Sequence, residues 1–154
     1  MPFLSTILVV EDVIKSRALY GDLLGCVVEI DFGVYNVGFK GGLALYQKEL
    51  FCSLTDNLEI KEKANNFVTY FEFKDINTIE DTIEKKGFEF IHKTREQPWG
   101  QKVFRFYDFD NYIVEVAEDM ITVLHRMFNS GMTVDEIAKK TGYTVDKVTN
   151  DLNL

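Results

Sequence analysis

Two carboxylates in this 154-residue chain stand where apolar side chains are expected. Glu115 lies near the end of the run "DFDNYIVEV", whose alternate residues are typical of a protein core, and Glu72 stands between two phenylalanines in "YFEF". A carboxylate removed from water can serve as a general base, because burial disfavours its charged form, and it can also hold a cation. Glu115 is therefore the candidate catalytic group if the chain is an enzyme, and both residues are candidate ligand contacts.

Aromatic side chains occur near these carboxylates along the predicted strands. Aromatic faces bind cations and flat rings, so together with the carboxylates they predict an acidic, aromatic pocket for a cationic or aromatic small molecule. Each carboxylate also has a structural alternative: Glu115 could accept hydrogen bonds from Arg105, and Glu72 faces solvent if the strand register shifts by one residue. The aromatic candidates are Tyr46, Tyr70, Trp99 and Tyr107, and Gln101 and Arg105 are weaker candidates for the same pocket.

Composition excludes several classes of partner. The formal net charge of -8 disfavours phosphate backbones and anionic membranes, which reward clustered Lys and Arg. No apolar run approaches the roughly 18 residues that a membrane span needs. The N-terminal stretch lacks the basic segment and the cleavage site of a secretory signal, so we expect a cytoplasmic protein. Cys26 and Cys52 lie far apart, which predicts free thiols rather than a disulfide.

The elements that must position these side chains occur twice. Ile7–Gly25 and Tyr70–Gly87 each contain an apolar strand, an aspartate and a helix-period segment that ends on glycine. Asp12 and Asp75 are suited to cap the N-termini of these helices, and the glycines suit the left-handed position after a helix. The sequence therefore predicts two copies of a strand–helix unit.

Three short alternating runs follow each strand–helix unit, which makes both halves β-α-β-β-β. This pattern predicts an α+β fold of two βαβββ modules, at about 4–47 and 67–118, with a linker at 48–66 and a helical tail at 119–154. The runs are Val27–Asp31, Val34–Phe39 and Leu43–Gln47, then Phe88–His92, Val103–Tyr107 and Tyr112–Ala117.

Three short motifs in this order resemble the vicinal oxygen chelate superfamily, which includes glyoxalase I, the extradiol dioxygenases and the bleomycin and fosfomycin resistance proteins. They are Val10-x-Asp12 followed by "LYGDLLG", the Pro98-Trp99-Gly100 element, and "DFDNYIVE", which is similar to the family's D-P-D-G-N-x-(I/V)-E. The Pro-Trp-Gly element resembles the bleomycin-resistance-like branch. The resemblance implies that the sheets of the two modules curl into a cup.

The resemblance also implies a divalent metal in the cup, held by two His, Gln or Glu side chains from each module. The matching positions are Ser5, Leu45 or Tyr46, Val68 and Glu115. Since only Glu115 is a good ligand for a hard or borderline ion, we expect no metal and no other cofactor. Ser5 remains a candidate ligand contact on the same face.

Three functions follow from this reading. The first is a metal-free protein that sequesters a small molecule as a homodimer, like the bleomycin resistance proteins. The second is a lyase or isomerase of the glyoxalase type that uses a cup carboxylate as a base. A dioxygenase-type activity is also conceivable, although the metal ligand set is incomplete. The third is a ligand sensor with a partner-binding helical tail.

The tail resembles a helix-turn-helix. A helix to about Phe128, a second from Thr133 with a capping box to Glu136, and a third from Thr144 are predicted. We do not expect nucleic-acid binding, because the third helix is acidic where a recognition helix carries basic or amide groups. Its apolar residues are instead expected to pack on the cup or on a second subunit: Ile137, Ala138, Val145, Val148 and Leu152.

Overall fold

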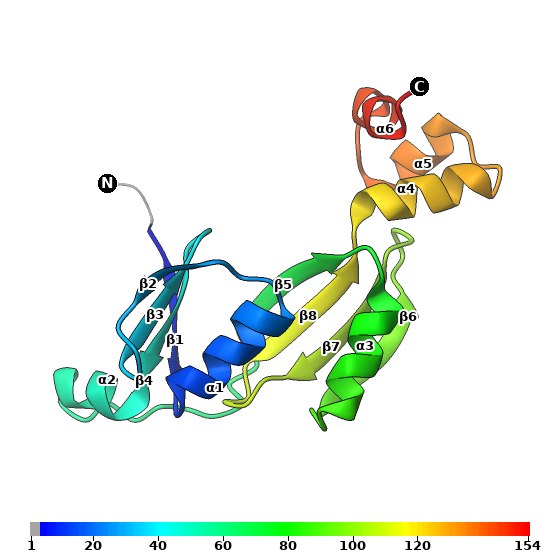
Figure 1. Cartoon of the computed structure of the whole chain (residues 1–154). Coiled ribbons are helices and arrows are strands. Elements are labelled where there is room, and N and C mark those ends of the chain that lie inside the picture. Colours follow the sequence, from blue (N-terminus) through cyan, green and yellow to red (C-terminus); the bar gives the residue numbers. More distant parts are fainter. Residues whose placement is uncertain (1–3) are drawn as a thin grey trace. The chain divides into compact units, whose positions relative to one another are not determined.

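The computed structural model describes residues 4–154 and has two four-stranded mixed sheets with six α-helices (Figure 1). The predicted α+β class and the two βαβββ modules are confirmed. The described chain forms two compact units. Unit 1 is the chain up to Ala64 together with Asp108–Tyr112, and unit 2 is Asn65–Tyr107 together with Ile113–Leu154.

Unit 1 holds the first βαβββ module. Its sheet has the order β1-β4-β3-β2, in which β1 and β4 run parallel and the other neighbours run antiparallel. A short helix, α2, occupies part of the predicted linker. The elements are β1 (Thr6–Val10), α1 (Val13–Arg17), the π-helical segment η1 (Ala18–Leu23), β2 (Val28–Asp31), β3 (Asn36–Phe39), β4 (Leu43–Gln47) and α2 (Lys48–Leu54).

The first helix begins as predicted but is not uniform. Asp12 caps it by accepting a hydrogen bond from the Lys15 backbone N–H. From Ala18 the chain widens into the π-helix η1, a correction to the single regular helix that the period predicts. Leu19 and Tyr20 lie in this segment and are both buried in the core.

Unit 2 repeats the module and adds the tail. Its sheet has the order β5-β8-β7-β6, with β5 and β8 parallel. The elements are β5 (Val68–Phe73), α3 (Ile76–Lys85), β6 (Phe90–Glu96), β7 (Lys102–Tyr107), β8 (Ile113–Glu118), α4 (Met120–Asn129), α5 (Val134–Thr141) and α6 (Val145–Leu152).

Helix α3 covers one face of this sheet (Figure 1). Its isoleucines at 76, 79 and 83 are buried, as their helical spacing predicts, and Asp75 caps its N-terminus. On the sheet, Phe104 and Phe106 are fully buried and their rings lie 6.1 Å apart. Because successive strand residues alternate between faces, the residues between these phenylalanines belong to the opposite face.

Strand β6 differs from its prediction. It was expected at Phe88–His92 and runs from Phe90 to Glu96. Phe88 instead closes the turn after α3, donating its N–H to Ile83 O, and its ring packs edge-on against Phe106. The pairing of β6 with β7 contains two register shifts, which a strict period-2 pattern does not anticipate.

The tail forms a three-helix bundle with the predicted boundaries. The capping box between Thr133 and Glu136 is present, and Gly142 ends α5 with a φ of 76°. The expected packing of the tail on the cup is wrong for its buried residues, because these pack against α4 in a core within the bundle, while Val145 is 45% exposed. The bundle core is Val123, Leu124, Met127, Ile137, Ala138, Val148 and Leu152.

Two further properties concern the described residues as a set. Cys26 and Cys52 are both free thiols, as expected, and burial raises the pKa of Cys26. No α-helix in residues 4–154 exceeds ten residues, so none of these helices could cross a bilayer, which requires roughly 20 apolar residues.

Candidate ligand-binding face

The sheet face of unit 2 opposite α3 carries the polar and aromatic candidates from the second module. Strand pairing places Val68 beside Ile113, Tyr70 beside Glu115 and Glu72 beside Ala117. We call this surface the open face. Its residues are Val68, Tyr70, Glu72, His92, Arg95, Val103, Arg105, Tyr107, Ile113, Glu115 and Ala117, of which Val103 and Ala117 are buried.

One residue from each strand meets in a row across the open face. Tyr70 is in register with Glu115, Glu115 with Arg105, and Arg105 with His92. Arg105 Nε donates a hydrogen bond to Glu115 Oε2 over 2.5 Å, and Arg105 Nη1 lies 2.8 Å from His92 Nε2. The Glu115 side chain is only 15% exposed and that of Arg105 is 24% exposed.

This ion pair explains why a carboxylate can stand among the apolar residues of β8. A half-buried carboxylate is tolerated here because a guanidinium beside it balances its charge and satisfies one oxygen. The structural alternative from the sequence, a hydrogen bond from Arg105, is therefore present. The ion pair with Arg105 therefore accounts for Glu115 without a catalytic role.

A second polar chain joins the aromatic candidates Tyr70 and Trp99. The Tyr70 hydroxyl donates to Glu72 Oε1 over 2.7 Å and accepts from Gln101 Nε2 over 2.9 Å. Trp99 Nε1 donates to Gln101 Oε1 over 2.8 Å. Tyr70 is 50% exposed and Trp99 is 37% exposed, so both hold fixed polar contacts while presenting ring surface.

Tyr70 remains a neutral phenol at physiological pH. Partial burial, followed by its hydrogen bond to Glu72, raises the pKa of Tyr70 to about 12. The hydroxyl is therefore a lasting donor to Glu72, which makes no ion pair among the described residues. Glu72 is exposed, on the face that the unshifted register predicts.

The remaining sequence candidates lie apart from this cluster. Tyr107 is on the open face beside Ile113, and its hydroxyl donates to Asn65 Oδ1 over 2.9 Å. Tyr46 is in β4 of unit 1, where its ring packs edge-on against Phe51, and Ser5 precedes β1 in the same unit. Hydrogen bonds therefore connect Tyr70, Glu72 and Trp99 within unit 2, whereas Ser5 and Tyr46 belong to unit 1.

The residues at the family's metal positions do not fit a divalent ion. Val68 has no donor atom, and Glu115 is already paired with Arg105. Within residues 4–154 no three His, Cys, Asp or Glu side chains come together as a metal site would need. No chemical step is therefore derived through a metal, and metal independence stays a prediction.

Two contributors were undervalued from the sequence. Gln101 and Arg105 seemed weak pocket candidates, yet Gln101 joins Tyr70 to Trp99 and Arg105 holds Glu115. The signal for Arg105 was available, because period-2 alternation from Val103 puts it on the open face. Gln101 could not be found in this way, because it lies in the loop before β7.

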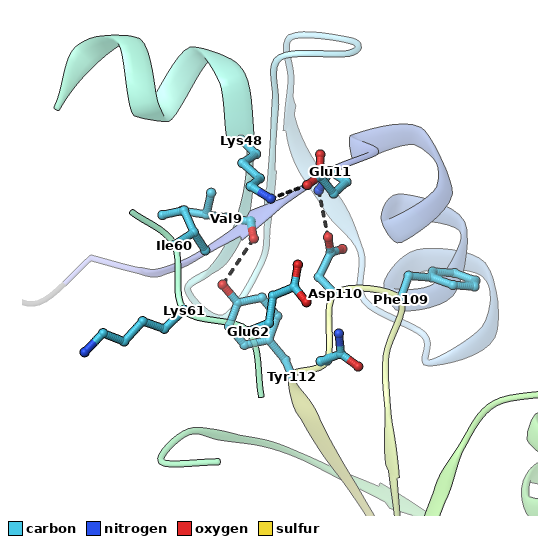
Figure 2. Close-up of a pocket in the computed structure, with 10 residues that line it drawn as sticks. Val9, Glu11, Lys48, Ile60, Lys61, Glu62, Phe109, Asp110 and Tyr112 are labelled. Carbon is cyan, nitrogen blue, oxygen red and sulfur yellow. Dashed lines mark hydrogen bonds and ion pairs between the residues drawn. The ribbon is translucent and has the colours of Figure 1, made fainter. Parts of the chain in front are cut away.

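The Asp-Phe-Asp-Asn element has a structural role in unit 1 (Figure 2). Asp110 accepts a hydrogen bond from the Glu11 backbone N–H over 2.8 Å, and the Tyr112 hydroxyl donates to Val9 O over 3.1 Å. The cavity beside them has a volume of about 60 Å³. This is room for about two water molecules rather than for an organic ligand.

A larger groove of about 380 Å³ lies at the ends of β1 and β4 in unit 1. Three of its polar side chains already have structural roles: Asp12 caps α1, Gln47 caps α2, and Glu11 pairs with Lys48. Two of its three carboxylates, Glu11 and Asp12, are therefore less available to a ligand than Glu72 on the open face.

The paired βαβββ modules define a protein of the vicinal oxygen chelate superfamily. The chain belongs to the glyoxalase-like domain family, whose model matches residues 3–121. A protein of unknown function from Agrobacterium tumefaciens str. C58 is 34% identical, with a TM-score of 0.66 over 77% of this chain and 94% of that one. No curated protein gives a significant match.

Two further solved structures share the fold at low identity. A glyoxalase-related enzyme from Fulvimarina pelagi is 13% identical, with a TM-score of 0.64 over 79% of this chain and 90% of that one. A lactoylglutathione lyase from Agrobacterium tumefaciens is 20% identical, with a TM-score of 0.56 over 78% and 95%. At these identities the likeness concerns the fold and not the activity.

Proposed function

We propose that this protein binds an aromatic, positively charged small molecule on the open face, without a metal, and sequesters it. The observation that carries the proposal is the polar chain in which Gln101 and Glu72 hold the partly exposed ring of Tyr70 beside Trp99. Aromatic side chains that are fixed by hydrogen bonds can stack on a ligand with little further loss of conformational freedom.

Of the two candidate carboxylates on the open face, only Glu72 supports a cationic ligand. Glu115 is balanced by Arg105, which removes one of the two carboxylates that made the predicted pocket acidic. Glu72 has no such counter-ion among the described residues, so a ligand's positive group is expected beside Glu72 and its ring against Tyr70 or Trp99. A cytosolic homodimer is part of the same proposal.

The lyase or isomerase alternative has less support. Its candidate bases are Glu115, which is ion-paired with Arg105, and Glu72, which is exposed rather than desolvated. The lyase among the similar structures is too distant to indicate an activity. The sensor alternative concerns the tail and depends on the contacts that α4 makes with the second βαβββ module.

The test uses three small probes that share a benzyl or phenyl ring and differ in charge: benzyltrimethylammonium, benzyl alcohol and benzoate. Saturation-transfer NMR is expected to show binding in the order cationic, neutral, anionic, with no change on adding EDTA or zinc. Equal or absent transfer for all three probes, or binding that needs zinc, would contradict the proposal.

Replacing Glu72 tests the charge assignment. Glu72→Gln should reduce the preference for benzyltrimethylammonium over benzyl alcohol by about five-fold, as expected for the loss of one partly exposed charge contact of roughly 1 kcal/mol. Asp81→Asn is the matched control, because it removes the same charge from α3, on the opposite side of the sheet. An equal effect of the two variants would assign the preference to overall charge rather than to the site.

A further inference from the structure

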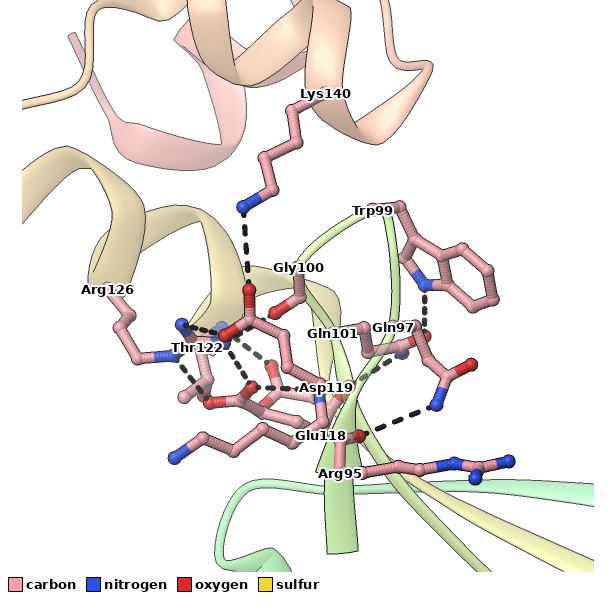
Figure 3. A network of polar contacts seen from close by, with 12 residues as sticks. Arg95, Gln97, Trp99, Gly100, Gln101, Glu118, Asp119, Thr122, Arg126 and Lys140 are labelled. Carbon is pink, nitrogen blue, oxygen red and sulfur yellow. Dashed lines mark hydrogen bonds and ion pairs between the residues drawn. The ribbon is translucent and has the colours of Figure 1, made fainter.

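Within unit 2, Arg126 of α4 connects the tail to the second βαβββ module (Figure 3). Its Nη2 donates to Glu118 Oε2 and to Gly100 O, each over 2.7 Å, and its Nε donates to Glu118 Oε1 over 3.2 Å. The Glu118 side chain is only 6% exposed, so this is a bidentate, largely buried pair with limited freedom. Arg126 lies beyond residues 3–121, the part that the family model matches.

The loop that Arg126 holds is a tight turn pressed against α4. Gly100 N donates to Gln97 O and Gln97 N donates to Gln101 O, each over 2.8 Å. Gly100 has a φ of 88°, and a Cβ atom there would lie 1.9 Å from Met127 Cε. The loop and the helix are therefore in direct contact, and a movement of α4 would displace Gly100.

Gln101, the next residue, uses both ends of its buried amide. The side chain is 3% exposed, its Nε2 donates to Glu118 O over 2.8 Å and to the Tyr70 hydroxyl, and its Oε1 accepts from Trp99. Glu118 thus meets Arg126 through its carboxylate and Gln101 through its backbone carbonyl. A continuous polar network runs from α4 to the two aromatic rings.

We propose that Gln101 and Arg126 are the positioning residues of the open face. Gln101 sets the orientation of Tyr70 and Trp99, and Arg126 holds the loop of Gln101 against α4. The tail thereby contributes to the ligand site without touching the ligand. The role in ligand binding rests on the proposed function, but the positioning itself does not.

Trp99 is the only tryptophan in the chain, so its indole N–H gives a single signal in a ¹H–¹⁵N spectrum and its emission is unambiguous. In Gln101→Met the indole loses its acceptor. Its N–H signal should shift and exchange faster with water, and acrylamide should quench its emission more strongly than in the wild type. Lys147→Met is the matched control, because it removes an ion pair of the tail, with Asp151 inside α6, that involves neither Gln101 nor Arg126.

Arg126→Met tests the contribution of the tail. This change alone leaves the buried Glu118 carboxylate unpaired and can unfold the chain, so Glu118→Gln is combined with it. The double variant should reproduce the shift of the Trp99 signal in the ligand-free protein. A wild-type Trp99 signal in Gln101→Met, or in the folded double variant, would overturn the proposal.

The effect on ligand binding is measured in a separate experiment. Gln101→Met should weaken benzyltrimethylammonium binding about five-fold, the ratio that corresponds to one lost hydrogen bond. A wild type that binds none of the three probes would refute the proposed function, while the Trp99 signal of the ligand-free variants would still decide the positioning. A Trp99 shift with unchanged probe binding would refute the role of Gln101 in the ligand site.

Discussion

Two carboxylates near the last hairpin are stabilised in different ways. Glu115 is paired with Arg105 on the open face. Asp108 is buried in unit 1, where it accepts a hydrogen bond from the Tyr20 hydroxyl over 2.7 Å and others from the backbone N–H groups of Asp110 and Tyr112. The alternation of residues predicted the location of Glu115. The turn motif around Asp108 was recognised, but its link to Tyr20, 88 positions away, depends on tertiary packing.

Asp108 should make stability depend on pH. Burial raises its pKa from 3.8 to about 6, so the folded state binds a proton more tightly than the unfolded state, and stability falls as pH rises from about 4 to 6. This pKa shift corresponds to a loss of roughly 3 kcal/mol in the free energy of unfolding over that pH range. The loss should be absent in Asp108→Asn. Urea unfolding of the wild type and of Asp108→Asn between pH 4 and 7 measures this loss. Parallel pH curves for the two proteins would contradict this assignment.

At the scale of elements, local signals predicted more than long-range ones. The caps at Asp12, Asp75 and Thr133 are present, because a cap needs only the residue and the helix that follows it. Strand β6 was misplaced because its two register shifts depend on pairing with β7. Gln101 was undervalued for the same reason, since its partners lie 31 and 17 positions away in the sequence.

The contact between the loop and α4 predicts a difference between two glycine substitutions. Gly100→Ala meets both a left-handed backbone and Met127, whereas Gly131→Ala, at a φ of 96°, meets only the backbone term because no atom lies within 4 Å. The backbone term is about 1–2 kcal/mol in each variant, and displacing the buried methyl group of Met127, which ends a flexible side chain, should add about 1 kcal/mol to Gly100→Ala. Urea denaturation gives both values. Equal losses of stability in the two variants would mean that the loop and Met127 accommodate the added methyl group without a cost in free energy.

The chain combines a glyoxalase-like domain with a helical tail formed by α4, α5 and α6. The family model ends at residue 121, close to the start of α4, and the bundle of α4, α5 and α6 has its own buried core. The capping signals of the tail predicted its helices from the sequence. The sequence could not predict which residues join the bundle to the second module, since Arg126 binds a carboxylate and a carbonyl on separate elements. The tail is therefore best understood from its polar contacts rather than from its resemblance to a helix-turn-helix.

We expect the interface of the proposed homodimer to include the hairpin formed by β2 and β3 in unit 1. Large apolar side chains are exposed there, among them Ile30 at 50%, Phe32 at 67% and Val34 at 54%, and β2 is an edge strand of its sheet. An edge strand and an exposed apolar patch suit a two-fold contact with a second copy of the chain. Analytical ultracentrifugation should show a dimer that Phe32→Asp weakens about ten-fold or more. Leu58→Asp, which charges another exposed apolar site of unit 1, should leave the dimer intact. A monomeric wild type would remove the dimer from the proposal, and equal effects of the two variants would place its interface elsewhere.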